Sequence, residues 1–230
     1  MSYTSLGYML FVACCLIFYY IFPKKHRWWV LLAASIGFYA IVCLKYISFV
    51  FVTAASTYAG GRILEAYANK HKAYIKSQKG IWPKEERDLY KAKVSRRKKW
   101  ITAAILLLNF GILGFLKYYN FFADALNVLL NPLGGGLPEL GLFLPLGISF
   151  YTFQPMGYII DIYREKFPAE RNFGKMLLFT SFFPQIVQGP ISFYSDLSGK
   201  LYEGHDISFS NIKQGVLLIT WGFFKKLVIA

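Results

Sequence analysis

The most restrictive feature of this sequence is a series of long stretches without a single charged residue. Residues 1–23, 28–44, 46–61 and 140–160 all lack Asp, Glu, Lys and Arg. A helix of about 20 apolar residues crosses the hydrocarbon core of a bilayer. Charged residues make up 17% of the 230-residue chain, against about 25% in soluble proteins. The sequence therefore predicts an all-α, polytopic transmembrane helical bundle in contact with membrane lipid.

Charges and prolines between the apolar stretches predict where the spans end. Pro23 and the basic residues after it end the first helix, which we expect to be retained as an anchor rather than cleaved. Lys45 divides the next two stretches, which together are too long for one span. A further helix is predicted to start at Trp82-Pro83 and to continue into residues 101–116 as a fourth span, followed by a turn on the outer side at residues 131–136.

Positive charge is concentrated in one part of the chain. The formal net charge is +14, and the segment from Lys70 to Lys99 holds twelve Lys or Arg against three acidic residues, or +9. Lys and Arg collect in the cytoplasmic loops of membrane proteins. We therefore expect a cytoplasmic loop at residues 62–99 in a multi-pass protein of the cell membrane, and no nucleic-acid partner.

Two apolar segments contain residues that a plain lipid-facing helix avoids. Residues 140–160 and 176–195 are interrupted by Pro, Gly and Gln. Backbone groups freed at membrane depth must be satisfied by protein or by a water-filled cavity. We therefore expect broken or re-entrant helices that line a passage. The candidate passage-lining residues are Pro145, Gly147, Ser149, Gln154, Tyr158, Asp161, Arg164, Pro184, Gln185, Gln188, Gly189 and Pro190.

Two interpretations remain open for the polar members of this set. Asp161 and Arg164 are three residues apart, so they either form an ion pair where the helix leaves the lipid or mark the passage. The three glutamines either orient a ligand or satisfy the broken backbone. A last helix is predicted at residues 214–224, opened by residues 207–211.

Groups that usually carry enzyme chemistry are sparse. His26, His71 and His205 all lie outside the apolar segments, and we expect solvated side chains for the first two. His205, in Glu-Gly-His-Asp, could belong to a metal or catalytic loop but lacks the spacing of a ligand set. Cys14, Cys15 and Cys43 lie inside apolar stretches and are expected to be free thiols. The sequence contains no metal-ligand set and no Gly-rich phosphate loop. We expect no metal, no cofactor and no catalytic residue within these 230 residues.

Several segments resemble the membrane-bound O-acyltransferase family, in its bacterial alginate O-acetyltransferase-like branch. The first signature is Leu-Pro-Leu-Gly-Ile-Ser-Phe-Tyr-Thr-Phe-Gln at residues 144–154, continued by residues 158–164. The second is Phe-Phe-Pro-Gln-Ile-Val-Gln-Gly-Pro-Ile at residues 182–191, and residues 109–120 and 221–227 also fit. Gln188 departs from the second signature, where relatives more often have a small residue.

The resemblance implies transfer of an acyl group, often acetyl, to a hydroxyl of an extracytoplasmic or cell-envelope polysaccharide. The acyl donor would approach from the cytoplasmic side, and the acceptor would be the polysaccharide itself or a partner acetyltransferase. The family's intramembrane histidine, its general base, has no match here. The resemblance therefore implies that residues 1–230 are the amino-terminal part of one acyltransferase domain and that this part alone is inactive.

Two alternatives remain open at this point, besides a third class, a noncatalytic membrane scaffold. The first is D-alanyl transfer to teichoic acid within the same family. The second is a transporter or lipid flippase, which would also have broken helices and a basic cytoplasmic face.

Overall fold

The computed structural model describes residues 5–78, 81–130, 135–140, 147–186, 189, 191–225 and 228. Within these ranges the regular structure is helical, as predicted for an all-α chain. Two long helical segments, Lys24–Ser77 and Lys84–Val128, are apolar enough over part of their length to cross a membrane.

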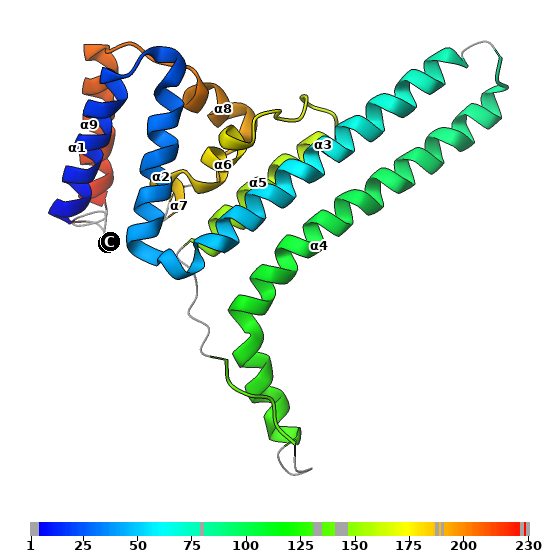
Figure 1. Ribbon diagram of the computed structural model, residues 1–230, viewed down its shortest axis with the longest axis horizontal. Helices are drawn as coiled ribbons and strands as arrows, with labels where there is room; N and C mark the ends of the chain where they lie inside the picture. Colours follow the sequence, from blue (N-terminus) through cyan, green and yellow to red (C-terminus); the bar gives the residue numbers. More distant parts are fainter. Residues whose placement is uncertain are drawn as a thin grey trace.

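Three helices make up the first third of the chain (Figure 1). α1 spans Leu6–Ile21 with Ser5 as its N-cap, and α2 spans Arg27–Cys43 after the 3₁₀ turn η1, Lys24–His26. α3 spans Ile47–Ser77 after a second 3₁₀ turn, η2, Leu44–Tyr46. The division predicted at Lys45 is confirmed, because this residue lies in the turn between α2 and α3.

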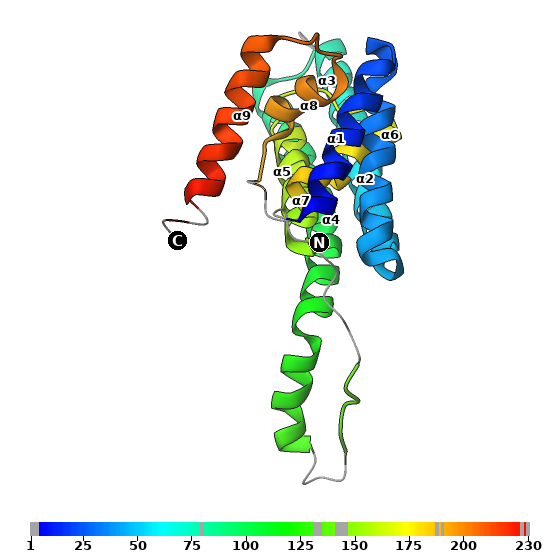
Figure 2. The ribbon, with the colours of Figure 1, turned by 90° about the vertical axis from the view of Figure 1, so that its left-hand side faces the viewer.

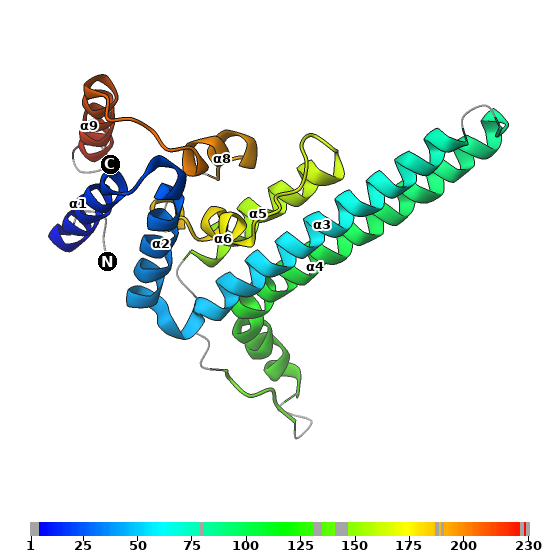
Figure 3. The ribbon, with the colours of Figure 1, turned by 45° about the horizontal axis from the view of Figure 1, so that its top comes forward.

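α3 and α4 form a long antiparallel hairpin (Figure 3). α4 spans Lys84–Leu130, has Glu85 and Glu86 in its first turn, and runs unbroken into the apolar half of the chain, as predicted from Trp82-Pro83. Much of the expected loop at residues 62–99 is therefore helical, because residues 62–77 belong to α3 and residues 84–99 to α4. Aromatic rings bridge the two helices near the hairpin tip, where Tyr74 and Trp82 pack against Tyr90.

Two adjacent glycines let the helices approach closely at the inner half of the hairpin. A Cβ at Gly60 would lie 2.5 Å from Ile105 of α4. A Cβ at Gly61 would lie 3.0 Å from the Tyr158 hydroxyl of α5, the helix Ile148–Tyr163. Small residues commonly occupy such positions in membrane helices, where close packing drives association. α3, α4 and α5 thus pack around a shared core.

The two segments predicted to be broken differ from each other. α5 is continuous through Pro155, so a break at this proline is wrong. Pro155 removes one helical hydrogen bond, and its own ring is buried by neighbouring helices. The second segment is interrupted as predicted, because α6 (Phe173–Ser181) ends before Phe182 and the short α7 (Phe183–Ile186) follows.

The remaining helices lie on the side of α1 and α2. α8, Tyr194–Tyr202, packs against α6 and α2. α9, Phe209–Phe224, begins after the N-cap Ser208 and has no buried residue among those described. These bounds confirm the last helix predicted at residues 214–224. Figure 2 shows α9 standing at the edge of the molecule. Most of its large apolar side chains are exposed.

Asparagine side chains hold the extended segment at residues 135–140 against α4. Asn120 exchanges two hydrogen bonds with the backbone of Leu140, at 2.8 and 3.2 Å, and Asn127 exchanges two with Leu137, at 3.0 and 2.7 Å. These amides satisfy backbone groups that have no strand partner.

Candidate functional site

The two signatures meet in the interior through a chain of side-chain hydrogen bonds. Gln154 of α5 is buried, and its Nε2 donates to Gln185 Oε1 of α7 at 3.0 Å and to the Phe179 carbonyl of α6 at 3.3 Å. Gln185 Nε2 in turn donates to Ser192 Oγ at 2.7 Å. The side-chain amide of Gln154 therefore supplies a donor to backbone near the end of α6, where the helix is about to break.

The start of α5 contacts the end of α7 at van der Waals distance. Gly147 has φ +70°, in the left-handed region, and a Cβ there would lie 2.1 Å from the Ile186 carbonyl oxygen. Gly189 is also confined by its neighbours, because a Cβ added there would lie 2.6 Å from the Gln185 Cα. Only glycine combines the backbone conformation and the close approach that position 147 requires. Two of the predicted passage residues are therefore points of close packing.

The break between α6 and α7 is also tied to α2. The backbone N–H of Phe183 donates to Ser35 Oγ at 3.3 Å, and Ser35 itself donates to the Leu31 carbonyl at 2.7 Å. The aromatic ring of Phe183 packs on Phe38 and Phe11 from α2 and α1. Pro184 and Ser149 are half-buried beside this junction.

Tyr158, at the other end of α5, binds the segment that leads into α6. Its hydroxyl accepts a hydrogen bond from the Glu170 N–H at 2.9 Å, and the Glu170 carboxylate accepts one from the Tyr194 hydroxyl at 2.7 Å. The rings of Tyr158 and Tyr194 are 4.8 Å apart between centroids. Tyr158 is thus a buried link between α5, residue 170 and α8.

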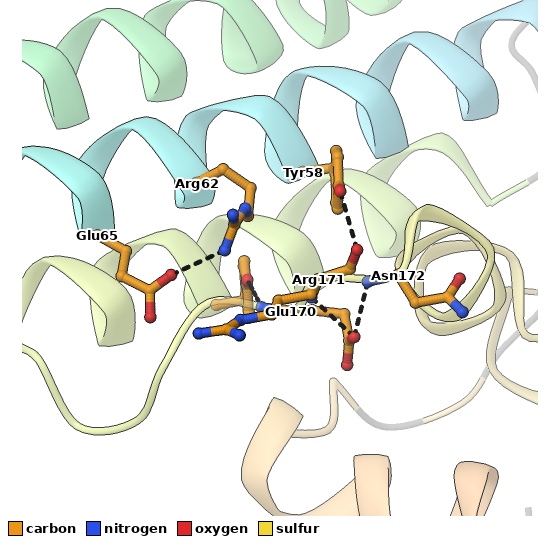
Figure 4. Close-up of polar contacts among 7 residues, drawn as sticks. Tyr58, Arg62, Glu65, Glu170, Arg171 and Asn172 are labelled. Atoms are coloured by element: carbon orange, nitrogen blue, oxygen red, sulfur yellow. Dashed lines mark hydrogen bonds and ion pairs between the residues drawn. The ribbon is translucent and has the colours of Figure 1, made fainter.

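Glu170 organises the turn before α6 (Figure 4). Its Oε1 accepts hydrogen bonds from the N–H groups of Arg171 and Asn172, at 2.8 and 2.9 Å, and the Tyr58 hydroxyl of α3 donates to the Arg171 carbonyl at 3.0 Å. Arg62 lies beside this turn and pairs with Glu65 at 3.1 Å. Polar residues of α3 therefore face the entrance to α6.

Asp161 forms an ion pair, but its partner differs from the residue three positions away. Its Oδ1 lies 2.6 Å from Lys166 Nζ, whereas Arg164 is an exposed residue at the C-cap of α5. The chain reverses after α5 through Glu165, which has φ 58°, and this reversal brings Lys166 back over Asp161. The helical spacing alone does not predict that partner.

Glu165 links the end of α5 to both helices of the hairpin. Its carboxylate pairs with Lys72 of α3 and, at 2.5 Å, with Lys98 of α4. Hydrogen bonds from Lys72 first, and from Lys98 second, lower the pKa of the Glu165 carboxyl. Two cavities adjoin this contact, of about 590 Å³ between α3 and α4 and about 410 Å³ between α3 and residues 162–168. The second lies next to the Asp161 pair.

The three histidines lie outside the buried junction. His26 is exposed in η1. His205 is exposed in a loop, and its backbone carbonyl accepts a hydrogen bond from the Arg27 guanidinium at 2.5 Å. His71 is half-buried, with its Nδ1 2.6 Å from the Tyr90 hydroxyl across the hairpin. All three cysteines are free. Over the described parts of the chain, no group of three His, Cys, Asp or Glu side chains is placed to hold a metal ion.

Pro145, Gln188 and Pro190 lie outside the described residues. Sequence reasoning missed Glu165 and Glu170, which lie at the two ends of the segment that joins α5 to the turn before α6. Each carboxylate contacts at least two other residues. Glu165 could have been noticed as an acid beside the predicted helix end, whereas its partners are 67 and 93 positions away in the sequence. Glu170 carries no local signal of its role.

These features define an α-helical membrane protein in which the broken segment meets a buried helix through satisfied polar contacts. The protein named "Probable alginate O-acetylase AlgI" of Azotobacter vinelandii is 30% identical over 223 residues, which cover 96% of this chain and 40% of that protein. Its namesake in Pseudomonas aeruginosa is 30% identical over 224 residues, covering 96% and 38%. A peptidoglycan O-acetyltransferase of Helicobacter pylori is 29% identical over 160 residues, covering 58% and 30%.

The chain belongs to the membrane-bound O-acyltransferase family, as the signatures predict. It spans about two fifths of the length of the alginate O-acetylase relatives described above. No family model matches the sequence, and no solved structure matches it. The names of these relatives support neither the D-alanyl transfer alternative nor the transporter alternative.

Proposed function

We propose that the chain forms the amino-terminal part of an O-acyltransferase that transfers an acyl group, specifically acetyl, to a hydroxyl of a cell-envelope or extracytoplasmic polysaccharide. The observation that carries this proposal is the 30% identity over 96% of the chain to a protein named as an alginate O-acetylase. The general base is expected to be a histidine beyond residue 230, so the part described here contributes the scaffold and not the reacting groups.

In this proposal the two signatures form one wall of the passage through which the acyl group reaches the acceptor. The buried amide of Gln154 and the half-buried amide of Gln185 are polar groups inside an otherwise apolar helix cluster. A cavity lined by Ile162, Glu165 and Lys166 adjoins the end of α5 that carries Asp161. Polar groups at membrane depth are costly to bury unless they line a pathway or form hydrogen bonds with each other. In this structure the two amides form a hydrogen bond with each other.

The outer half of the α3–α4 hairpin faces the cytoplasm in this proposal, as its excess of Lys and Arg favours. The acyl donor would then approach from the hairpin side. The segment at residues 135–140 lies at the opposite end of α4 and would face outward (Figure 1).

The activity is tested by expressing the whole protein in a cell from which its own polysaccharide O-acetylation gene is deleted. Ester-linked acetate on the purified envelope polysaccharide is then measured after mild alkaline release. Restored ester acetate supports the proposal. Unchanged acetate with the protein present in the membrane contradicts acetyl transfer, and ester-linked D-alanine in its place would identify a different acyl group.

The orientation is tested by cysteine labelling of intact cells with a membrane-impermeant maleimide. In a background without Cys14, Cys15 and Cys43, Lys84→Cys at the hairpin tip is expected to label only after the cells are opened. Glu139→Cys, at an exposed position near the far end of α4, is the matched control and is expected to label from outside. Labelling of the hairpin tip in intact cells would reverse the proposed topology.

A further inference from the structure

The cavity between the outer halves of α3 and α4 has a strongly cationic wall. Its volume is about 590 Å³, within the range of about 300–1,000 Å³ that is typical of small-molecule sites. The charged residues of its wall are Lys72, Lys76, Arg87, Lys91, Lys98 and Glu165. Five cations therefore face one carboxylate, so the cavity has an uncompensated positive charge.

The carboxylate neutralises only the inner end of the cavity. Glu165 pairs with Lys72 and Lys98, which are the wall cations nearest to the apolar halves of the helices. Lys91 makes a single contact of 3.5 Å, with the exposed Asp88. In the part of the chain that the structure describes, the Arg87 Nε is buried and has no hydrogen-bond partner. A buried donor without an acceptor is costly, so this guanidinium is poised for an anion.

The position of the free cations along the hairpin indicates where such an anion would come from. Lys76 lies fifteen positions after Gly61, the last residue of the charge-free stretch 46–61, or about 22 Å further along the helix at about 1.5 Å per residue. The headgroup layer on each side of a bilayer is only about 5–8 Å deep. Arg87 lies eleven positions before Lys98 on α4, about 16 Å further from the apolar half. The free cations are therefore placed beyond the lipid headgroups.

We propose that this cavity binds a water-soluble anion carrying a phosphate or diphosphate group, held by Arg87, Lys76 and Lys91. An arginine fork matches phosphate oxygens, and lysines add point charges. Three cations without a strong internal partner suit a ligand with two or more negative charges. The site is independent of the proposed acyl transfer, because its test measures binding and not activity.

The test is calorimetric titration of inorganic pyrophosphate into the whole protein in phosphatidylcholine nanodiscs. We expect saturable binding at one site per chain. Arg87→Gln and Lys76→Gln should each raise the dissociation constant about tenfold, the loss of one charge-assisted contact. Neither side chain makes an ion pair among the described residues, so both variants are expected to fold, as circular dichroism would check. Glu165→Gln should lower the constant several-fold, because it releases Lys72 and Lys98.

The matched control is Arg97→Gln, which removes the same charge from an exposed position on α4 outside the cavity wall. We expect it to change the constant by less than about twofold, in line with a screened surface charge. Absence of saturable binding, or an equal loss in Arg87→Gln and Arg97→Gln, would overturn the site. Nanodiscs with phosphatidylglycerol separate the two sources of phosphate. If anionic lipid abolishes pyrophosphate binding, a headgroup fills the cavity and access from water is disproved.

Discussion

Polar side chains are paired in one region of the molecule and, among the described residues, partly unpaired in another. The first region is the inner junction of α5 with α6 and α7, and the second is the outer half of the α3–α4 hairpin. At the junction, Gln154 and Gln185 bond to each other and to their neighbours. In the wall of the hairpin cavity, cations outnumber carboxylates, and the Arg87 Nε has no acceptor within the described part of the chain. Paired polar groups fix the helices in one arrangement, whereas a cation without an internal partner is left able to bind a ligand. The contrast separates a structural region from a binding region.

The largest effect is expected at the point where the two signatures touch. Gly147→Ala would place a Cβ 2.1 Å from the Ile186 carbonyl oxygen and would force a side chain into φ +70°. Strain and overpacking together should lower the free energy of unfolding by about 2–4 kcal/mol. Thermal and denaturant unfolding in detergent would measure the loss.

The control for this variant is Gly157→Ala in the same helix. No atom lies within 4 Å of a Cβ at Gly157, and alanine favours a helix by up to about 1 kcal/mol over glycine. We expect unchanged or slightly higher stability. Equal destabilisation by both substitutions would show that the junction is not the constrained point.

The next effect concerns the amide pair. Gln154→Met keeps the length of the side chain but removes the donor to the half-buried Gln185 amide oxygen and to the Phe179 carbonyl. This should cost about 1–3 kcal/mol. A double-mutant cycle with Gln185→Met is expected to give a coupling of about 0.5–1.5 kcal/mol, and a coupling near zero would contradict the contact.

A smaller effect is expected at the close approach of α3 and α5. Gly61→Ala places a Cβ 3.0 Å from the Tyr158 hydroxyl, so the aromatic side chain must shift. We expect a loss of about 1 kcal/mol in unfolding free energy. Gly114→Ala on α4, where no atom lies within 4 Å of the added Cβ, is the control and should be neutral. Matching losses would remove the special role of Gly61.

The smallest effect is expected at Glu165, whose ion pairs with Lys72 and Lys98 tether the end of α5 to the hairpin. Hydrogen bonds from Lys72 and Lys98 lower the pKa of Glu165 below its ordinary value of 4.5. Its contribution to stability is therefore present above pH 4.5 and disappears as the pH falls through the lowered pKa. Because Glu165 is partly exposed, Glu165→Gln should cost less than about 1 kcal/mol at neutral pH.

The pH dependence of unfolding distinguishes this tether from general acid sensitivity. Glu165→Gln should reduce the loss of stability below pH 4.5, whereas Glu139→Gln, which removes an exposed carboxylate beside the far end of α4, should leave it unchanged. Identical acid profiles for the wild type and Glu165→Gln would show that the tether carries no stability.

Local sequence signals correctly predicted several helix ends. Lys45 lies in the turn between α2 and α3, and α4 begins directly after Pro83 with acidic residues in its first turn. The interruption near Pro184 is also present. These features depend on residues within one helical turn, where capping, charge and the missing proline N–H act.

Pro155 shows where a local rule was insufficient. A proline in an apolar segment usually predicts a break, but α5 runs through it because the surrounding helices bury this part of the helix. Packing energy summed over many buried side chains exceeds the cost of one lost backbone bond.

The sequence by itself determined that this chain is helical and apolar in long segments, that its positive charge lies between two of them, and which family it resembles. Those properties follow from composition and from neighbours along the chain. Only the tertiary structure decided that Gln154 pairs with Gln185, 31 positions away, and that Glu165 joins Lys98, 67 positions away. It also left the Arg87 Nε without a hydrogen-bond partner among the described residues, in the wall of a cationic cavity. The physical reason is that side-chain partners at such separations are set by how helices pack, which local patterns do not encode.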